Sequence, residues 1–220
     1  MDSRIANGIR ALELMESNSR FDALRRMNGN HPGAPEWFVK LMSALTDAAG
    51  RAKHHLYRGI EEEDISYVAW ASRMLLEVQV WGRYCTQSLE NAESFARDYY
   101  RDATGLAGAL AAVIREGGYF HEELEESLRN IAGMMRAQRF EDLSVRYTDV
   151  GKIAETFPDI QFAPFNKILS KAVHPTAYMV QTDSPNLVGD NMLPAMAICG
   201  LAAGMGYYRD IEQYVSKVGL

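Results

Sequence analysis

Apolar residues recur every three or four positions through most of this chain, and that spacing predicts one helix after another. The clearest case runs from Glu62 to Ser88, where apolar residues lie on nearly every face of the predicted helix. Such a helix is typical of the centre of a bundle, because an outer helix keeps a polar face. We therefore expect the segment from Glu62 to Ser88 to form the central, buried helix.

Further helices are predicted on both sides of this segment by local start and stop signals. Residues 3–17 show helical spacing, Pro35 suits the first turn of the next helix, and Gly59 can end it. Ser88 can cap the helix that follows the central one. The remaining predicted helices cover residues 89–116, a segment beginning around Phe120, Val150–Thr156, Phe165–Val173 after Pro164, and about residues 188–216.

The predicted fold is all-α. No stretch shows strand-like alternation, a repeat or a low-complexity linker, so we expect a bundle of about seven to nine helices. We predict a single domain over 1–220, in which 1–33 form an N-terminal helix and linker and 34–220 form the main bundle. In the last helix, the pattern Gly200-x-x-x-Gly204 predicts tight packing against a neighbour.

Charge and cysteine content narrow the class of protein. The formal net charge of −6 argues against a surface that is basic throughout, although a local basic groove stays open. The two cysteines allow no zinc spacing and no disulfide framework, which predicts a reducing compartment. The first residues lack the basic and apolar regions of a secretory signal peptide. The apolar run of the last predicted helix is shorter than a membrane-spanning helix, which needs about 20 residues. We expect a cytoplasmic protein with no membrane partner.

One candidate site lies on the predicted helix Phe165–Val173. Asn166, Ser170 and His174 are spaced by four, so one helical face would present an amide, a hydroxyl and an imidazole in a row. At the helix C-terminus the dipole would favour the protonated form of His174. That histidine could act as a general acid or base, or could simply cap backbone carbonyls. The candidate catalytic residues are therefore His174, Ser170 and Asn166.

A second candidate site lies within the central helix, where Arg73 and Glu77 have the spacing that lets opposite charges meet. Trp70, Trp81 and Tyr84 lie on the same predicted face. In one interpretation this face lines an internal groove, in which the arginine holds a phosphate or carboxylate. In the other, Arg73 and Glu77 form a buried structural pair between helices.

Other recognisable chemistry is missing from the sequence. Neighbouring histidines such as His54 and His55 point to different faces of a helix, and no His-x-x-x-His or Glu-x-x-His spacing occurs. There is also no P-loop, dinucleotide-binding glycine motif, nucleophile elbow or zinc motif, and no helix suited to base recognition. We expect no metal and no cofactor.

Two segments carry a family resemblance. The block from Trp81 to Asp98, WGRYCTQSLENAESFARD, looks like part of a helical domain family of uncharacterised bacterial proteins. In that family a charged central helix is followed by a helix with a Phe and an Arg/Asp pattern. The segment from Ile168 to Thr176, ILSKAVHPT, resembles the same family's Leu-Ser-x-x-x-His signature. These proteins look related to HEPN-like helical bundles, many of which occur in toxin–antitoxin and phage-defence systems.

The resemblance implies two kinds of function. Active HEPN-like proteins are metal-independent ribonucleases with an Arg-x(4–6)-His motif that comes together across a dimer. Here no arginine stands four to six residues before His174, so Lys167 or the distant Arg73 would have to replace it. In that case histidine would supply acid–base chemistry and the cation would stabilise the phosphate. A non-catalytic binding or scaffold domain of the same type would need no such cation.

We therefore expect a HEPN-like binding or regulatory protein of bacterial defence or stress type, which forms a homodimer and has RNA or a protein as partner. One alternative is a metal-independent ribonuclease that uses His174. The other is a small-ligand sensor with its pocket at Arg73 and Glu77. The candidate ligand- or phosphate-binding residues are Arg73, Glu77, Lys167, Trp70 and Tyr84.

Overall fold

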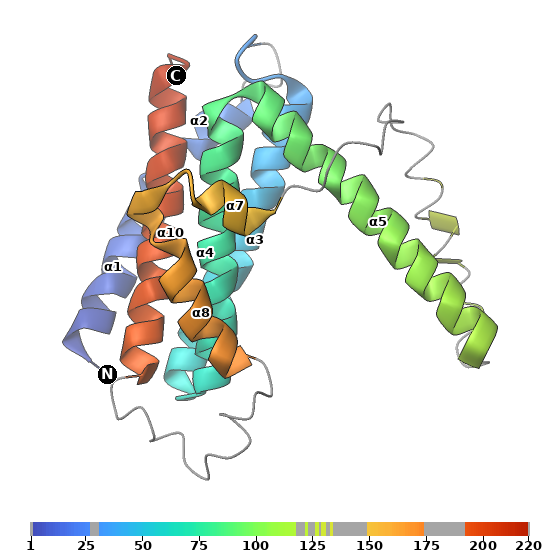
Figure 1. Ribbon diagram of the computed structural model, residues 1–220. Helices are drawn as coiled ribbons and strands as arrows, with labels where there is room; N and C mark the ends of the chain where they lie inside the picture. Colours follow the sequence, from blue (N-terminus) through green and yellow to red (C-terminus); the bar gives the residue numbers. More distant parts are fainter. Residues whose placement is uncertain are drawn as a thin grey trace. The chain divides into compact units, whose positions relative to one another are not determined.

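The computed structural model describes residues 2–26, 31–117, 149–173 and 192–219, together with scattered positions between 122 and 133. These residues form eight α-helices and one short 3-10 helix, without any strand (Figure 1). The prediction of an all-α bundle is confirmed, and the number of helices agrees with it. The elements are α1 (Ser3–Ser17), α2 (Phe21–Arg26), α3 (Glu36–Glu61), α4 (Ile65–Gln87), α5 (Leu89–Gly117), α7 (Val150–Ala154), η1 (Pro158–Ile160), α8 (Phe162–Val173) and α10 (Met192–Lys217).

The contacts within the chain divide it into two compact units. Unit 1 comprises Met1–Ala92 and Asp149–Leu220, and unit 2 comprises Glu93–Thr148. The N-terminal helix α1 packs against α10 within unit 1. The prediction of a single domain over 1–220 stays a prediction, because a grouping by contacts does not decide whether unit 2 folds alone.

Side-chain caps determine where two of the long helices begin. The Asp64 carboxylate accepts a hydrogen bond of 2.9 Å from the Tyr67 backbone N–H, and α4 begins at the next residue. Ser88 Oγ accepts one of 3.1 Å from the Asn91 N–H at the start of α5, as predicted. Both caps satisfy a backbone donor that the first turn of a helix leaves without a partner.

Two predicted helix ends are wrong, for reasons of packing and geometry. Helix α3 continues past Gly59 to Glu61, and Gly59 is buried where a Cβ would lie 3.0 Å from Val68 Cγ2 of α4. That glycine therefore permits close packing of two helices and does not end one. Helix α8 begins at Phe162, so Pro164 is its third residue. A proline is tolerated there because first-turn N–H groups have no partner within the helix.

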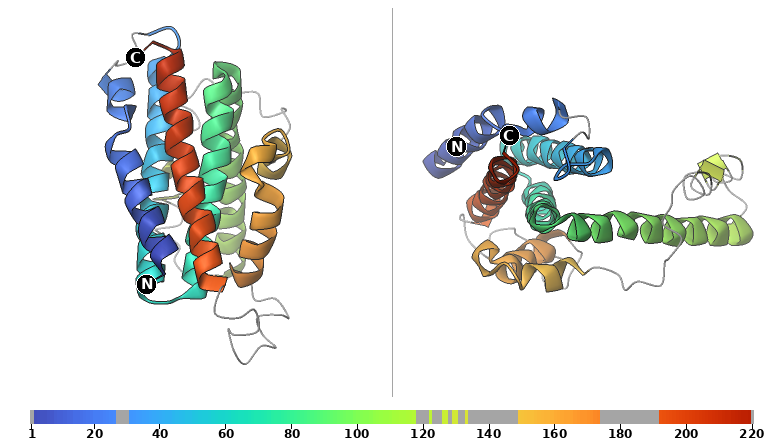
Figure 2. Two further views of the ribbon diagram at one scale, coloured as in Figure 1. Left: turned by 90° about the vertical axis from the view of Figure 1, so that its left-hand side faces the viewer. Right: turned by 90° about the horizontal axis from the view of Figure 1, so that it is seen from above.

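Helix α4 lies at the centre of unit 1, where it packs against α3, α7, α8 and α10. Figure 2 shows it enclosed by α3, α8 and α10. The central position is confirmed, but burial on every face is wrong. Ser66 is exposed, and Trp70 keeps 38% of its surface in solvent. The neighbouring helices thus leave one stripe of α4 facing outward.

Glycines let α10 approach its neighbours closely, as the pattern Gly200-x-x-x-Gly204 predicts. A Cβ on Gly200 would lie 2.9 Å from the Ser72 Cα of α4, which is too close for two carbon atoms. A Cβ on Gly204 would lie 3.1 Å from the Leu12 side chain of α1. Helix α10 is therefore held against both α1 and α4. Within the parts of the chain that the structure describes, no helix is long and apolar enough to cross a membrane.

Candidate functional site

Arg83, in the last turns of α4, joins three elements of unit 1. Its Nε and Nη2 donate to the two carboxylate oxygens of Asp210 on α10, at 3.0 and 3.2 Å. Its Nη1 lies 2.7 Å from each carboxylate oxygen of Asp159 on η1. The guanidinium carbon also lies 5.5 Å from the centre of the Phe157 ring, at cation–π distance. A planar group with five donors can make all these contacts at once, so Arg83 holds η1 and α10 to α4.

The two carboxylates around Arg83 differ in their access to solvent. The side chain of Asp210 is 5% exposed, that of Arg83 is 16% exposed and that of Asp159 is 62% exposed. Burial raises the pKa of Asp210, although Arg83 opposes that shift. Hydrogen bonding to Arg83 lowers the pKa of Asp159. Burial alone would lower the pKa of Arg83, but its bonds to Asp159 and Asp210 raise it.

These side chains line a pocket of about 520 Å³ between the C-terminal halves of α4 and α10 and the 3-10 helix η1, which we name the Arg83 pocket. This volume lies in the range of about 300 to 1,000 Å³ that is usual for small-ligand sites. The cations Arg83, Arg209 and Lys217 outnumber the carboxylates of Asp159 and Asp210. The other lining residues are Thr86, Gln87, Gln213 and Tyr214. A lining with excess positive charge and side-chain N–H and O–H donors suits an anion.

The predicted catalytic residues are described only in part, because His174 lies outside the described residues. Ser170 and Asn166 lie on α8, and Ser170 Oγ donates to Asn166 Oδ1 at 3.4 Å. The predicted row of hydroxyl and amide on one helix face is therefore present. Asn166 and Lys167 also line a second pocket, of about 390 Å³, which is formed by α7, η1 and α8. The catalytic role of these residues stays a prediction.

Arg73 and Glu77 contact each other on the outward stripe of α4, with Arg73 Nε 3.0 Å from Glu77 Oε1. Both side chains are half-buried, so the pair is not sealed in the core. Neither residue lines the Arg83 pocket or the pocket at Asn166. A surface pair at this helical spacing contributes about 0.3 to 0.5 kcal/mol. Tyr84 lies further along α4, where its ring packs edge-on against Trp81 with ring centres 6.2 Å apart.

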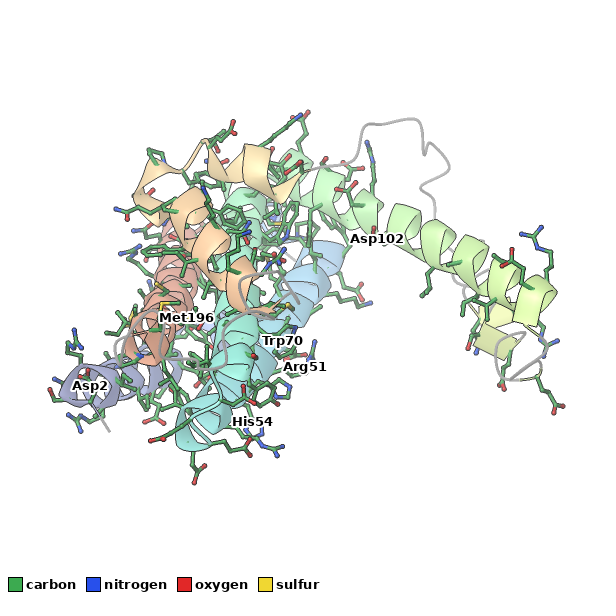
Figure 3. All side chains as sticks on the ribbon, turned by 60° about the horizontal axis from the view of Figure 1, so that its bottom comes forward. Asp2, Arg51, His54, Trp70, Asp102 and Met196 are labelled. Atoms are coloured by element: carbon green, nitrogen blue, oxygen red, sulfur yellow. The ribbon has the colours of Figure 1, made fainter. Side chains whose placement is uncertain are left out.

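Trp70 belongs to an aromatic cluster formed by α3 and α4. Its ring lies nearly parallel to that of Tyr67, with centres 6.1 Å apart, and 5.3 Å from the ring of His55. The Tyr67 hydroxyl is hydrogen-bonded to His55 Nδ1. Figure 3 labels Trp70 and the exposed His54 at this surface. Among the side chains that are described, His, Cys, Asp and Glu form no group of three that could hold a metal ion.

A third pocket, of about 440 Å³, lies where α1, α2, α3 and α10 meet. Glu16 lines it and accepts hydrogen bonds from Tyr208 Oη, at 2.9 Å, and from Lys53 Nζ. Nearby on α3, the buried Tyr57 hydroxyl has no hydrogen-bond partner within the described part of the chain. The charged groups of this pocket are mainly acidic, with Glu16, Asp22 and Asp47 against Arg51, so it does not share the chemistry of the Arg83 pocket.

Sequence reasoning missed the Arg83 pocket, although one signal was present. Asp210 stands among Tyr207, Tyr208, Ile211 and Tyr214 on the apolar face of the last helix. A carboxylate on a buried face needs a cation beside it, because an unpaired buried charge is costly. That rule predicts a basic partner for Asp210 without naming it. The choice of Arg83 depends on how α4 and α10 pack.

Comparison with known proteins gives no match to a family model, to a curated protein or to a solved structure. The anion-binding function proposed below is therefore inferred from the chemistry of the chain's own side chains.

Proposed function

We propose that this chain is a non-catalytic, regulatory binding protein that recognises a small anion in the Arg83 pocket. The supporting observation is the guanidinium of Arg83, which is fixed by its ion pair with the buried Asp210 carboxylate. Two more cations, Arg209 and Lys217, line the same pocket. A guanidinium that is already immobilised loses little conformational freedom when it binds a ligand. Arginine suits carboxylate and phosphate groups because its donors match the geometry of two oxygens.

Binding of inorganic phosphate, measured by isothermal titration calorimetry, tests this function. The double variant Arg209→Gln/Lys217→Gln removes two exposed pocket cations and keeps both members of the Arg83–Asp210 ion pair. We expect its affinity to fall by at least about tenfold, because a hydrogen bond to a charged group contributes about 1.5 kcal/mol or more. The matched control is Arg10→Gln/Lys171→Gln, which removes the same charges at exposed positions outside the pocket. Equal affinities for both double variants would contradict the proposed site.

The HEPN-like relationship, and the defence or stress role that it implies, remain part of this proposal. The all-helical fold supports the HEPN-like relationship. The Leu-Ser part of the signature also supports it, because this part lies on α8 with Leu169 buried and Ser170 half-buried. The proposed homodimer, and RNA or a protein as partner, rest on the resemblance alone. Light scattering of the purified protein tests the dimer, and a monomer at all concentrations would contradict it.

The ribonuclease that uses His174 remains the alternative. Glu77 already pairs with Arg73, one of the two cations suggested to replace the missing arginine. The other, Lys167, lines the pocket at Asn166. An assay of RNA cleavage with the unaltered protein, His174→Ala and Lys167→Gln separates the two functions. Cleavage that is lost in His174→Ala, with helical content unchanged, would favour the enzyme over the binding protein.

Our proposal keeps the binding of a small ligand but assigns it to a different pocket. Its predicted pocket at Arg73 and Glu77 is replaced by the Arg83 pocket, because Arg83 has a defined cavity beside it. Trp70 and Tyr84 then have no part in binding the anion, since neither lines the Arg83 pocket. Substitution of Arg73 by Gln should leave phosphate binding unchanged in the same calorimetric measurement.

A further inference from the structure

The two carboxylates that pair with Arg83, those of Asp210 and Asp159, differ in the free-energy cost of breaking their ion pairs. Asp210 is buried on the long helix α10 and accepts bonds from two guanidinium nitrogens. Its departure would leave two charges unpaired in the protein interior, which is costly. Asp159 is largely exposed and belongs to the three-residue helix η1. Water can solvate its carboxylate as soon as the ion pair opens, so exposed pairs of this kind separate at little cost.

We propose that Asp159 occupies the position of a ligand on Arg83, and that a phosphate group entering the Arg83 pocket displaces Asp159 and loosens η1. This inference rests on the proposed function of the pocket. Its starting point is that both oxygens of Asp159 lie 2.7 Å from Arg83 Nη1, while Arg83 and Asp159 both line the pocket. Asp159 thus makes to Nη1 the contact that a ligand oxygen would make.

A phosphate group has an advantage over Asp159 in this competition. Its oxygens point in several directions, so one can bind Nη1 of Arg83 while others contact Arg209 and Lys217 across the pocket. It also carries more negative charge than a single carboxylate. A phosphate monoester therefore fits the pocket better than a monocarboxylate does, and we expect acetate to bind more weakly than phosphate.

Displacement of Asp159 would loosen the segment that joins α7 to α8. Helix η1 is held to Arg83 by the Asp159 ion pair and by the Phe157 ring. Within η1 itself, the Ile160 N–H donates to the Phe157 carbonyl at 3.0 Å, and the Gln161 N–H donates to the Pro158 carbonyl at 3.4 Å. Loss of the ion pair leaves this short helix held by its two backbone hydrogen bonds and by the buried side chains of Phe157 and Ile160. Binding of the anion is thereby coupled to the mobility of residues 157–161.

The substitution Asp159→Asn tests this competition, because the amide keeps the shape of the side chain and removes its charge. We expect it to bind inorganic phosphate up to about fivefold more tightly than the unaltered protein, because an exposed ion pair contributes up to about 1 kcal/mol. The matched control is Glu155→Gln, which removes one negative charge at an exposed position near η1 that does not line the Arg83 pocket. Its affinity for phosphate should stay unchanged, which separates competition at Arg83 from a general electrostatic effect.

Hydrogen exchange at the Ile160 and Gln161 amides gives the second readout. In the unaltered protein, phosphate should speed this exchange relative to chloride at the same ionic strength. In Asp159→Asn the exchange should already be fast and should not respond to phosphate. A general change in surface charge would not produce this difference in local exchange.

The possible results separate the inference from the function on which it rests. If the unaltered protein binds phosphate but Asp159→Asn binds it equally or more weakly, the displacement is overturned and the anion pocket stands. Unchanged or slower exchange at Ile160 and Gln161 on phosphate binding would also overturn the displacement. If neither the unaltered protein nor Asp159→Asn binds phosphate, both the function and the displacement fail.

Discussion

The substitution Gly200→Ala tests the close packing that holds α10 against α4. The added Cβ would lie 2.9 Å from both Cα and Cβ of Ser72. Because one of these atoms belongs to the backbone, a change of side-chain rotamer cannot relieve the contact. The two helices must move apart, which strains the buried hydrogen bond of 2.8 Å from Ser72 Oγ to the Met196 carbonyl.

The expected effect on stability is the balance of three contributions. Overpacking of a core costs about 1 to 3 kcal/mol, and the loss of one hydrogen bond costs about 1 kcal/mol. Alanine gains about 1 kcal/mol over glycine from its helix propensity. The net result is a decrease of about 1 to 3 kcal/mol in the free energy of unfolding.

A matched control is available in α3. Outside the adjacent residues and the nearby backbone of α3 itself, no described atom lies within 4 Å of a Cβ placed on Gly50, so Gly50→Ala should gain helix propensity without a clash. We expect this variant to be more stable than the unaltered protein by up to about 1 kcal/mol. Urea denaturation followed by circular dichroism measures both variants. If Gly200→Ala were as stable as Gly50→Ala, the close approach of α10 to α4 would be refuted.

Three further predictions concern single side chains. Asp210→Ala removes the buried partner of the half-buried Arg83, which keeps only the exposed Asp159, and should lower the free energy of unfolding by about 1 to 3 kcal/mol; a loss below that of an average surface substitution in urea denaturation would contradict this role. Tyr57→Phe removes a buried hydroxyl without a described partner, so we expect a gain of about 1 kcal/mol in the same assay, whereas a loss would reveal a bond to that hydroxyl. The pKa of Asp159 lies below its usual value of 3.8, so its ion pair contributes stability above that pH and loses it as pH falls through the lowered pKa. The difference in stability between the unaltered protein and Asp159→Asn should therefore shrink below about pH 4, and a difference that stays constant from pH 7 to pH 3 would rule out the pair.

Local signals explain why most helices could be predicted from the sequence. The spacing of residues 3–17, Pro35 and the Ser88 cap of α5 each act within one or two helical turns. The first and last predictions are confirmed, and Pro35 lies directly before α3 where its first turn was predicted. Gly59 misled the prediction because a glycine can end a helix or admit a neighbouring one, and sequence spacing does not distinguish the two. The outward stripe of α4 was missed for a similar reason, since tryptophan on a helix does not reveal whether a neighbour covers it.

The candidate site was harder to predict because its parts are distant in the sequence. Arg83 and Asp159 are 76 residues apart, and Arg83 and Asp210 are 127 apart. Arg73 and Glu77 attracted attention because they are neighbours on one helix, and the structure confirms their contact. Sequence spacing can reveal such contacts between residues three or four positions apart on one helix. A pocket that joins α4, η1 and α10 depends on their packing, which no local pattern encodes.

The central claim is that the Arg83 pocket binds a small anion, and the most direct test is a phosphate titration followed by NMR. Signals of the Arg83, Arg209 and Lys217 side chains should shift together and saturate with one affinity, while Arg73 should not respond. Absence of saturable shifts at these three side chains, with the protein folded, would contradict the account.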